Sequence, residues 1–505
     1  MKSSIIKISV ITAVITITVT ASYIIAHLAG AQQNPLYIQK AMCAAIILTA
    51  VVTAATASVM MHRGFKSPEM IITAIMAVGI IMRVGYMLYT PCNVRQHDMW
   101  GFDADAGGHA AYILNLMQYH RLPLSNKLQF YQQPFFYIVG SLMSFIVNSL
   151  LNTSSAYELT DAARTAACTA SCLILPVADA LCRECDIGGR GRVISTALVA
   201  CSPVFYMTAG MLTPDSLSTL LMLLAVLYTV KWSNDCSWKN TVLLAVIYGL
   251  GVMTKVSVGV IALFTAAVFV IRLVKAVRTD TRQWKNLLPR YIVFGLISLP
   301  LGLWYSVRNY RMFGQPLGYV LDIGGSRSKL YTGDRSIVAR IFTFSFDNIM
   351  KGPYADVLND YNAPVYYLKS SLFGEYRYEA PAIIPAVLLF TALAVAAVAV
   401  LAIFYQLIHS KNKSIGYYVI PVVSILMYAS VTYFYMKYPY GCSMDYRYMG
   451  LLSVMAGVAL GRMCGNTVEI RFKNAVMNTC KLNKYTVFML AVFCTASVTM
   501  YIMVP

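Results

Sequence analysis

In the stretch from Arg95 to Tyr137, polar, charged and aromatic residues crowd together between strongly apolar segments. Its ionisable side chains include His97, Asp98, Asp103, Asp105 and His109. A carboxylate can orient or deprotonate a hydroxyl, and a histidine titrates close to neutral pH. Asp98 stands out because His97 precedes it and Gly107-Gly108 follows it, where a backbone without Cβ atoms can approach other groups closely. Asp98 is therefore the first candidate for chemistry.

Further ionisable or polar residues stand where later apolar segments begin or end. They are Asp215 in Thr213-Pro214-Asp215, Lys255, Arg308 with Asn309, and Arg447 with Tyr448. Charges next to hydrocarbon are costly, so they usually pair, bind an ion or line a cavity. Each also has a plainer interpretation: the cations can extend to lipid headgroups, and Asp215 can cap a helix. Asp103 and Asp105 can be solvated loop residues, and His109 can simply pack within the loop.

The elements that must position these residues are set by an apolar composition. Of 505 residues, 58% are hydrophobic and only 12% are charged, and the mean hydropathy is +0.62. A soluble protein carries about twice that share of charge. The formal net charge of +19 would suit a nucleic-acid partner only as a basic face on a folded domain. The composition indicates an integral membrane protein with no nucleic-acid partner.

Apolar runs approaching the roughly 20 residues that cross a bilayer recur along the whole chain. We predict spans at about 5–29, 41–61, 69–89, 161–182, 193–210, 214–231, 240–253, 256–274, 290–306, 381–408, 415–436, 446–463 and 485–503. The apolar segment 134–150 begins at Pro134 directly after the loop, so we expect it to lie in the membrane interface. The expected fold is an all-α polytopic membrane protein with about thirteen spans.

Charge distribution predicts the orientation of these spans. With a cytoplasmic N-terminus, every short inner loop is basic, as the positive-inside rule requires. The basic loops lie near 63–66, 183–192, 231–239, 272–290, 411–413 and 462–484. This places the candidate residues on the outer face of a plasma (cytoplasmic) membrane. The expected organisation is two accessory spans in 1–68, a core in 69–463 with outer loops at about 90–160 and 307–380, and a cytoplasmic loop with a last span in 464–505.

The stretch 95–137 and several later motifs resemble a known family. The run RQHD, GGHAAYI, RLP and QFYQQPFFY within 95–137 is similar to the first outer loop of the GT-C glycosyltransferases, which include protein O-mannosyltransferases and the lipid A aminoarabinose transferase. The later pieces follow in the order that the family shows: Ser202-Pro203, Thr213-Pro214-Asp215, Gly251 to Lys255, WYSVRN, Phe313 to Pro316, and Asp445 to Tyr448. The resemblance covers about residues 70–460. His97-Asp98 stands where the family usually has an Asp-Glu pair.

The resemblance implies a GT-C-like bundle that moves a sugar from a polyprenyl-phosphate donor to an acceptor hydroxyl in the cell envelope, usually with inversion. On this basis Asp98 would be the base or acceptor-orienting carboxylate, with His97 beside it and Asp215 as a second carboxylate. Lys255, Arg308 and Arg447 would bind the donor phosphate. The substrate pocket would be formed by Asp103, Asp105, His109, Tyr131, Gln133, Asn309 and Tyr448.

The same resemblance bears on cofactors and partners. Asp98, Asp215 and His109 could together hold one divalent cation, Mg²⁺ or Mn²⁺, if they lie close enough. The partners would be a lipid-linked sugar donor, membrane lipids and a glycan, lipid or protein acceptor. The rival interpretation from another class is a multi-span transporter or lipid flippase. Against it, the ionisable residues are predicted at one face, whereas a transport site lies near the midplane, and the spans show no matching halves.

Overall fold

The computed structural model describes residues 2–62, 68–279, 283–409, 414–465, 469–472 and 475–503. Parts of the predicted basic loops, at 63–67, 280–282, 410–413, 466–468 and 473–474, lie outside the described residues. The regular secondary structure of the described chain is helical, apart from one two-stranded antiparallel hairpin formed by β1 (Glu469–Phe472) and β2 (Ala475–Asn478). In this hairpin Glu469 pairs with Asn478. The all-α expectation is confirmed, and the hairpin in the predicted cytoplasmic loop is an addition to it.

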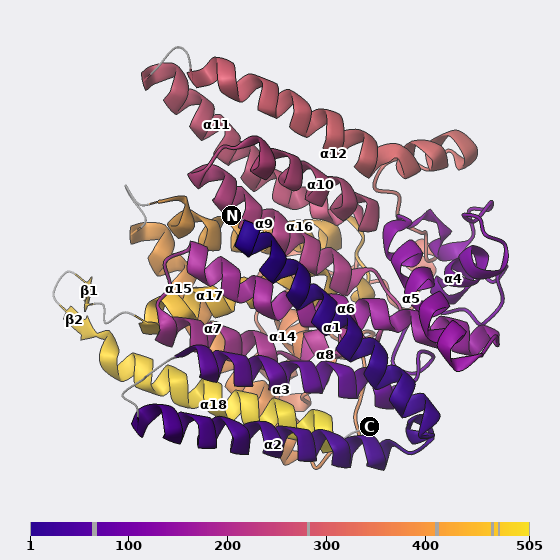
Figure 1. Cartoon of the computed structure of the whole chain (residues 1–505), viewed down its shortest axis with the longest axis horizontal. Helices are drawn as coiled ribbons and strands as arrows, with labels where there is room; N and C mark the ends of the chain where they lie inside the picture. Colours follow the sequence, from indigo (N-terminus) through magenta and orange to yellow (C-terminus); the bar gives the residue numbers. More distant parts are fainter. Residues whose placement is uncertain are drawn as a thin grey trace. The chain divides into compact units, whose positions relative to one another are not determined.

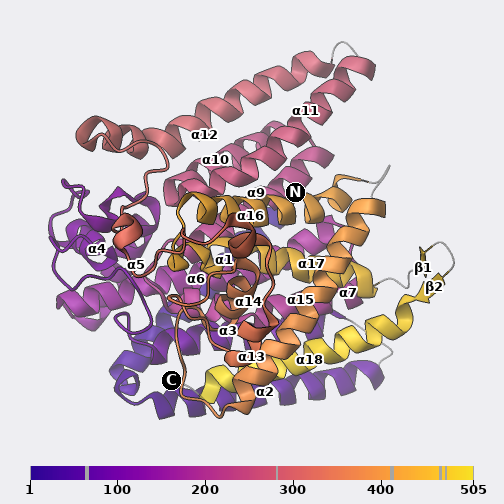
Figure 2. The same ribbon diagram turned by 180° about the vertical axis from the view of Figure 1, so that it is seen from behind.

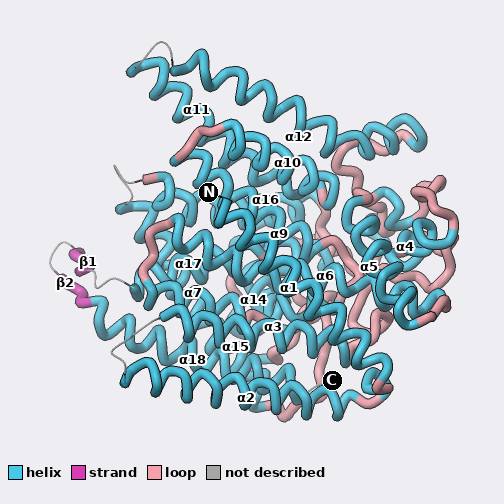
Figure 3. The backbone as a smooth tube through the Cα atoms, in the orientation of Figure 1, coloured by secondary structure: helices cyan, strands magenta, loops and turns pink. Residues whose placement is uncertain are grey.

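The first part of the chain forms long helices that are interrupted by one irregular region. The helices are α1 (Lys2–Leu28), α2 (Pro35–His62), α3 (Pro68–Tyr89), α4 (His109–Gln118), α5 (Phe135–Leu151), α6 (Ala156–Glu184), α7 (Gly189–Cys201), α8 (Pro203–Gly210), α9 (Asp215–Asn234), α10 (Trp238–Thr254), α11 (Ala262–Thr279) and α12 (Gln283–Phe313). The short turns η1 (Ala31–Gln33), η2 (Leu128–Tyr131) and η3 (Val256–Ile261) connect them. Figure 3 shows the loops drawn in pink around α4 and α5, the region of Asp98.

The second part of the described chain alternates short turns with six further helices. The helices are α13 (Phe346–Lys351), α14 (Ala363–Phe373), α15 (Ile383–His409), α16 (Ile415–Lys437), α17 (Leu451–Gly465) and α18 (Thr479–Met503). The turns are η4 (Gly325–Arg327), η5 (Val338–Phe342), η6 (Gly441–Met444) and η7 (Tyr446–Met449).

Ten of the described helices are long and apolar enough to cross a membrane, or twelve if each of two bent pairs counts as one span. The pairs are α7 with α8, bent by 46°, and Gly441–Met449 with α17, bent by 50°. The first bend falls where Pro203 starts a new helix, since proline cannot donate the backbone hydrogen bond that would continue the old one. The predicted span 240–253 corresponds to α10, whose 17 residues extend only about 25 Å at about 1.5 Å per residue. Our count of about thirteen therefore included one helix that is short for a bilayer.

The chain divides into two compact units. The first consists of Met1–Asn34, Met87–Val177 and Thr208–Asp322. In it α10 packs along α12, as Figure 1 shows, and the contact is close because a Cβ on Gly249 would lie 2.6 Å from the Leu301 side chain. Helix α5 begins after Pro134 and buries one face. Its other face exposes Leu142, Phe145 and Leu150, an apolar surface that suits contact with lipid.

The second unit consists of Pro35–Tyr86, Ala178–Met207 and Ile323–Pro505. Here α15 lies beside α18, visible in Figure 2, and α7 packs against α17. The last two helices touch through their backbones, because a Cβ on Gly191 would lie 2.3 Å from the carbonyl oxygen of Gly461. Small residues at such crossings are typical of helix packing in membranes.

Candidate active site

The backbone around Asp98 adopts an unusual conformation. Asp98 has φ of 66°, Arg95 has φ of 54° and Trp100 has φ of 56°, in the left-handed region that non-glycine residues rarely occupy. The His109 amide donates to the Asp98 carbonyl oxygen at 2.9 Å. A Cβ on Gly108 would lie only 2.2 Å from the carbonyl oxygen of Met99. The start of α4 therefore holds the Asp98 turn in place, and only glycine at 108 allows this approach.

The Asp98 carboxylate itself is left open. The residue is partly exposed, and within the described parts of the chain its side chain has no hydrogen-bond donor and no ion-pair partner among the protein groups. Strained backbone at a position with an unsatisfied carboxylate is a common feature of functional sites. Asp98 is thus positioned by its backbone while its side chain remains available to a ligand.

Asp215 is held in a different way. It lies 3% exposed in the first turn of α9, and the Lys255 Nζ donates to its Oδ1. Lys255 ends α10, so two helix ends far apart in sequence bring the charges together. The fold therefore brings together Asp215 and Lys255, which both stand beside apolar segments in the sequence. Their pairing compensates the cost of burying Asp215.

Gln96 connects the Asp98 turn to the segment leading to Asp215. Its side chain donates to the Leu212 carbonyl oxygen at 3.1 Å and accepts from the Leu212 amide at 2.7 Å. This reciprocal pair satisfies two backbone groups that would otherwise be buried without partners. The two carboxylate-bearing segments are therefore fixed relative to each other within one unit. The linking role of Gln96 was not predicted from the sequence.

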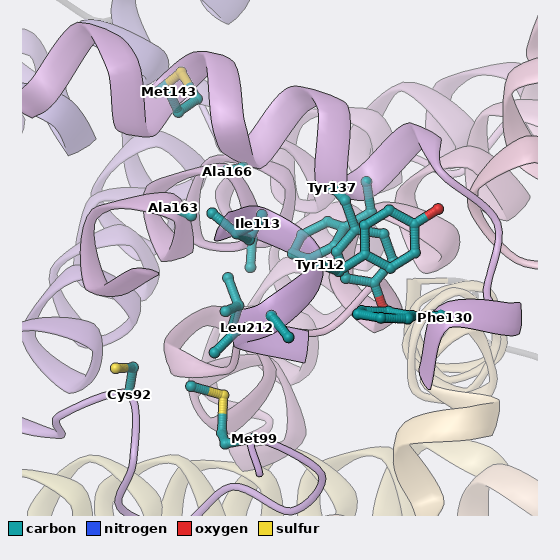
Figure 4. Close-up of a cluster of buried hydrophobic side chains, with 14 of the residues drawn as sticks. Cys92, Met99, Tyr112, Ile113, Phe130, Tyr137, Met143, Ala163, Ala166 and Leu212 are labelled. Atoms are coloured by element: carbon teal, nitrogen blue, oxygen red, sulfur yellow. The ribbon is translucent and has the colours of Figure 1, made fainter. Parts of the chain in front are cut away.

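An aromatic and polar cluster lies on α4 and α5 next to these segments. His109 is 3% exposed, and its Nδ1 lies 2.7 Å from the Tyr137 hydroxyl. The Tyr112 ring stacks on the Tyr137 ring with centroids 3.9 Å apart, as the close-up in Figure 4 shows. The Tyr112 hydroxyl donates to that of Tyr305 at 2.9 Å, which in turn donates to the Phe130 carbonyl oxygen. His109 therefore packs and hydrogen-bonds inside the loop.

Burial is the main cause that raises the pKa of the Tyr137 hydroxyl well above its usual value, and the Asp215 and Asp98 carboxylates add to that rise. Burial likewise raises the pKa of the Tyr112 hydroxyl.

The end of α12 fastens the second half of the loop. The Ser306 hydroxyl accepts from the Gln133 side chain at 2.8 Å, and Asn309 donates to the Tyr131 carbonyl oxygen at 3.3 Å. Arg308 donates to the Pro123 carbonyl oxygen at 2.6 Å and lies over the Tyr305 ring. The structure thus gives Arg308 and Asn309 a positioning role. Phosphate binding by Arg308 stays a prediction.

Three predicted residues of the loop lie at its surface. Asp103 and Asp105 are exposed, and the Asp103 carboxylate accepts from the Asp105 amide at 3.1 Å, a common side-chain-to-backbone turn. His97 is exposed as well. The solvated interpretation of the two aspartates therefore matches their observed places. Their contact with a substrate remains a prediction.

Arg447 and Tyr448 belong to the second unit. The Arg447 Nε lies 3.1 Å from an Asp445 carboxylate oxygen, and its Nη2 donates to the Tyr448 hydroxyl at 3.2 Å. Glu375 accepts from the Tyr366 hydroxyl at 2.8 Å. Burial raises the pKa of Tyr366, and the charges of Glu375 and Asp445 add to that rise. Asp445, Glu375 and Tyr366 thus form a local polar cluster, and Arg447 is already paired within its own turn.

The first unit contains a buried ionic centre that was not predicted from the sequence. Arg164 is 1% exposed and pairs with Asp161, which also accepts from the Tyr23 hydroxyl at 2.8 Å. The Arg164 guanidinium donates to the carbonyl oxygens of Met87, Thr90 and Gly210. Asp161 further accepts from the Cys92 amide at 3.1 Å. The only available signal was an Asp and an Arg three residues apart inside a predicted span.

The residues predicted to hold a metal do not form a ligand set. Among the described residues no group of three or more His, Cys, Asp or Glu side chains lies close enough to hold an ion. His109 directs its Nδ1 to Tyr137, and Asp215 pairs with Lys255. Asp98, Asp215 and His109 therefore do not fit a preformed metal site. The expectation of Mg²⁺ or Mn²⁺ remains a prediction, which an assay with and without a chelator would check.

Comparisons with known proteins find similar solved structures and one matching family model. A search of curated proteins finds no match. Among solved structures, AglB from Archaeoglobus fulgidus, an archaeal oligosaccharyltransferase in complex with an inhibitory peptide and a dolichol-phosphate, matches at 13% identity and a TM-score of 0.48. The match covers 86% of this chain but 55% of that chain, so this chain spans about half the length of that protein.

A second group of matches comes from another enzyme. ArnT from Cupriavidus metallidurans in the apo state matches at 15% identity and a TM-score of 0.35, covering 78% of each chain. The same protein bound to undecaprenyl phosphate matches at 15% identity and a TM-score of 0.32, covering 82% of this chain and 78% of that chain. All these TM-scores are below 0.5, so the structural matches carry no part of the functional argument.

One family model matches part of the chain. The model of dolichyl-phosphate-mannose-protein mannosyltransferase matches residues 158–304. That segment contains the Asp161–Arg164 pair and the Asp215–Lys255 pair, while the Asp98 turn precedes it. Within residues 158–304 the chain is therefore similar to the dolichyl-phosphate-mannose-protein mannosyltransferase family.

Proposed function

We propose that this protein is a membrane glycosyltransferase that transfers a sugar from a polyprenyl-phosphate donor to an acceptor hydroxyl, with Asp98 as the base. The family match supports the donor class, because the family is named for a dolichyl-phosphate-linked sugar. The observation that carries the assignment of the base is the open Asp98 carboxylate, held by a left-handed turn that Gln96 links to the segment leading to the buried Asp215–Lys255 pair. The transporter alternative has no comparable support.

In the proposed step, Asp98 accepts the proton of the acceptor hydroxyl as its oxygen attacks the anomeric carbon of the donor sugar. The bond from that carbon to the phosphate oxygen breaks, and the polyprenyl phosphate leaves with the bonding electron pair. A direct displacement of this kind inverts the anomeric configuration. Because the sugar transfers in one step, the protein needs one base and a cationic group for the leaving phosphate.

Lys255 is the best placed cation for that phosphate in the first unit. Its Nζ is paired with Asp215 while its side chain remains a quarter exposed, so part of the ammonium group can face a ligand. Asp215 would orient the Lys255 ammonium group through their ion pair. Phosphate binding by Arg447 stays a prediction. The active site is proposed at the outer face of the plasma membrane, where the acceptor is a glycan, lipid or protein.

The test is sugar release from a panel of polyprenyl-phosphate sugars by the purified protein, comparing the native chain with Asp98→Asn. We expect turnover with one donor class and a loss of about 10²–10⁴-fold in the variant, the usual contribution of a positioned base. The matched control is Asp347→Asn, because that carboxylate is 73% exposed in an i,i+4 surface pair.

Three outcomes separate the interpretations. Retained donor binding with lost turnover in Asp98→Asn supports the proposal. Full activity in that variant would contradict the role of Asp98 and direct attention to Asp215 or Asp103. Saturable donor binding without transfer to any acceptor hydroxyl in the native chain would favour a transporter or flippase.

A further inference from the structure

The second unit contains a buried arginine that no carboxylate neutralises. Arg340 is 5% exposed, and in the described parts of the chain no acidic side chain lies within ion-pair distance of it. Its Nη1 makes one long hydrogen bond, 3.4 Å, to the Tyr435 carbonyl oxygen, and its Nε is buried with no partner. An unpaired buried cation is costly. The arrangement implies that an anion completes this site.

Asp360, a buried carboxylate of the same unit, is already paired. Asp360 pairs with Lys369 at 3.2 Å and accepts from the Asp356 amide at 3.0 Å. Lys369 belongs to α14, the helix that packs against η5, where Arg340 lies. The Asp360 carboxylate therefore binds Lys369 and the Asp356 amide. A negative charge that neutralises Arg340 would have to come from a ligand.

The walls of the site are aromatic and fixed. The Arg340 guanidinium lies 5.2 Å from the centre of the Tyr435 ring, and the Tyr435 hydroxyl donates to the Tyr361 carbonyl oxygen at 2.7 Å. Arg335 stacks on the Tyr361 ring at 4.3 Å and is itself exposed. The strand-like pairing of Tyr331 with Tyr440 holds this segment to the end of α16. Two guanidinium groups thus rest on two linked tyrosines.

The same segment exposes an unusual number of large apolar side chains. This apolar patch consists of Ile337, Val338, Phe342, Phe344, Phe346 and Met350, which are between 39% and 75% exposed. Val338 and Phe342 lie two residues before and after Arg340 in the same five-residue π turn. Exposed apolar patches on proteins mark contacts with membranes or other proteins. Here the patch adjoins an unpaired cation.

We propose that Arg340 binds the phosphate of a membrane phospholipid whose acyl chains lie on the apolar patch. A guanidinium group matches phosphate oxygens in a bidentate geometry, and basic pockets beside apolar surface are the usual sites for lipid headgroups. The apolar patch favours a lipid over free phosphate, because free phosphate would leave Val338 and Phe342 uncovered. Bound lipid would hold residues 330–351 at the membrane surface, independently of the proposed transfer reaction.

The experiment titrates the purified full-length protein, in a neutral detergent without phosphate, with fluorescent dioleoyl phosphatidylglycerol. Competitors are unlabelled phosphatidylglycerol, dioleoylglycerol and inorganic phosphate. We expect saturable binding that Arg340→Gln weakens at least tenfold. The control Arg327→Gln removes an exposed arginine of the same segment and should leave the affinity unchanged. Unfolding temperature without lipid reports whether each variant folds.

A second variant keeps the test decisive if Arg340→Gln does not fold. Val338→Ser with Phe342→Ser alters only exposed side chains, so it should fold normally and bind phosphatidylglycerol several-fold more weakly. Competition by dioleoylglycerol as strong as by phosphatidylglycerol would overturn the phosphate contact. Competition by inorganic phosphate at the same concentration as the lipid would overturn the lipid assignment. Equal affinity in the native chain, Arg340→Gln and the double variant would overturn the whole proposal.

Discussion

Two acidic regions of the first unit differ in how completely the protein satisfies them. Asp161 accepts from Arg164, Tyr23 and the Cys92 amide, and Arg164 donates to three carbonyl oxygens from other segments. Asp98, in contrast, has its backbone fixed by the His109 amide while its carboxylate has no partner among the described protein groups. Both regions are tightly positioned, but only one leaves a charge free for a ligand.

The difference indicates which role each region has. A buried ion pair whose every donor is used adds little that a substrate could exploit, and removing one partner leaves an unpaired charge behind. An open carboxylate contributes little to folding but can accept a proton from a substrate. Stability should therefore depend on Asp161 and Arg164, whereas turnover should depend on the Asp98 turn. The Asp215–Lys255 pair shares features of both regions, because Asp215 is buried in an ion pair whereas Lys255 is partly exposed.

The largest effect is expected from Arg164→Met. The change leaves the Asp161 carboxylate buried without its cation and frees three carbonyl oxygens, which should cost about 3–5 kcal/mol of folding free energy. Thermal unfolding and the yield of monodisperse protein would measure it. Lys351→Met, in an exposed pair with Asp347, is the control and should change stability by less than about 1 kcal/mol. Equal effects of the two variants would remove the proposed contrast.

Lys255→Met should have a smaller effect on stability, about 1–3 kcal/mol, because it removes the ammonium partner of the buried Asp215 while Lys255 itself is partly exposed. Donor affinity and turnover should also fall if Lys255 faces the phosphate. The double variant Asp215→Asn with Lys255→Met should recover much of the stability but not the turnover. Recovery of both would show that the pair is purely structural, like Asp161 with Arg164.

Gly108→Ala tests whether the backbone positions Asp98. A Cβ at this position would lie 2.2 Å from the Met99 carbonyl oxygen and 2.6 Å from that of Asp98, so the turn has to shift. A misplacement of about 1 Å can reduce turnover by about 10²-fold, and overpacking should cost about 1–3 kcal/mol. Gly188→Ala, whose Cβ would meet nothing within 4 Å, is the control. Normal turnover in Gly108→Ala would argue against a positioned base.

The smallest effect is expected from Asp103→Asn. Its carboxylate is exposed and caps the Asp105 amide, and the asparagine side-chain oxygen can replace that contact. Stability should change by no more than about 0.5 kcal/mol, and turnover by less than about twofold if Asp103 only shapes the turn. A large loss of turnover would indicate that Asp103 is the base and would contradict the role proposed for Asp98.

Composition and apolar periodicity were sufficient to predict the helical membrane fold. Each predicted span overlaps a described helix or a bent pair of helices, because about 20 apolar residues in a row have few other stable solutions in a bilayer. Helix α10 shows the limit: hydropathy identifies the segment, but the helix between Ser237 and Lys255 has only 17 residues, which is short for a bilayer. The interfacial placement of α5 remains a prediction, since its 17 apolar residues suit a short helix in either position.

The sequence by itself determined the membrane class, the residue types available for chemistry and the region of the chain that carries them. Only the tertiary structure decided which charges meet. Asp215 meets Lys255 because the ends of α9 and α10 converge, and Arg308 meets the Pro123 carbonyl because α12 ends against the loop. Residue type fixes what a side chain can donate or accept, whereas its partners depend on contacts between segments that are distant in sequence. For that reason the Asp161–Arg164 centre and the unpaired Arg340 could be recognised only in the folded chain.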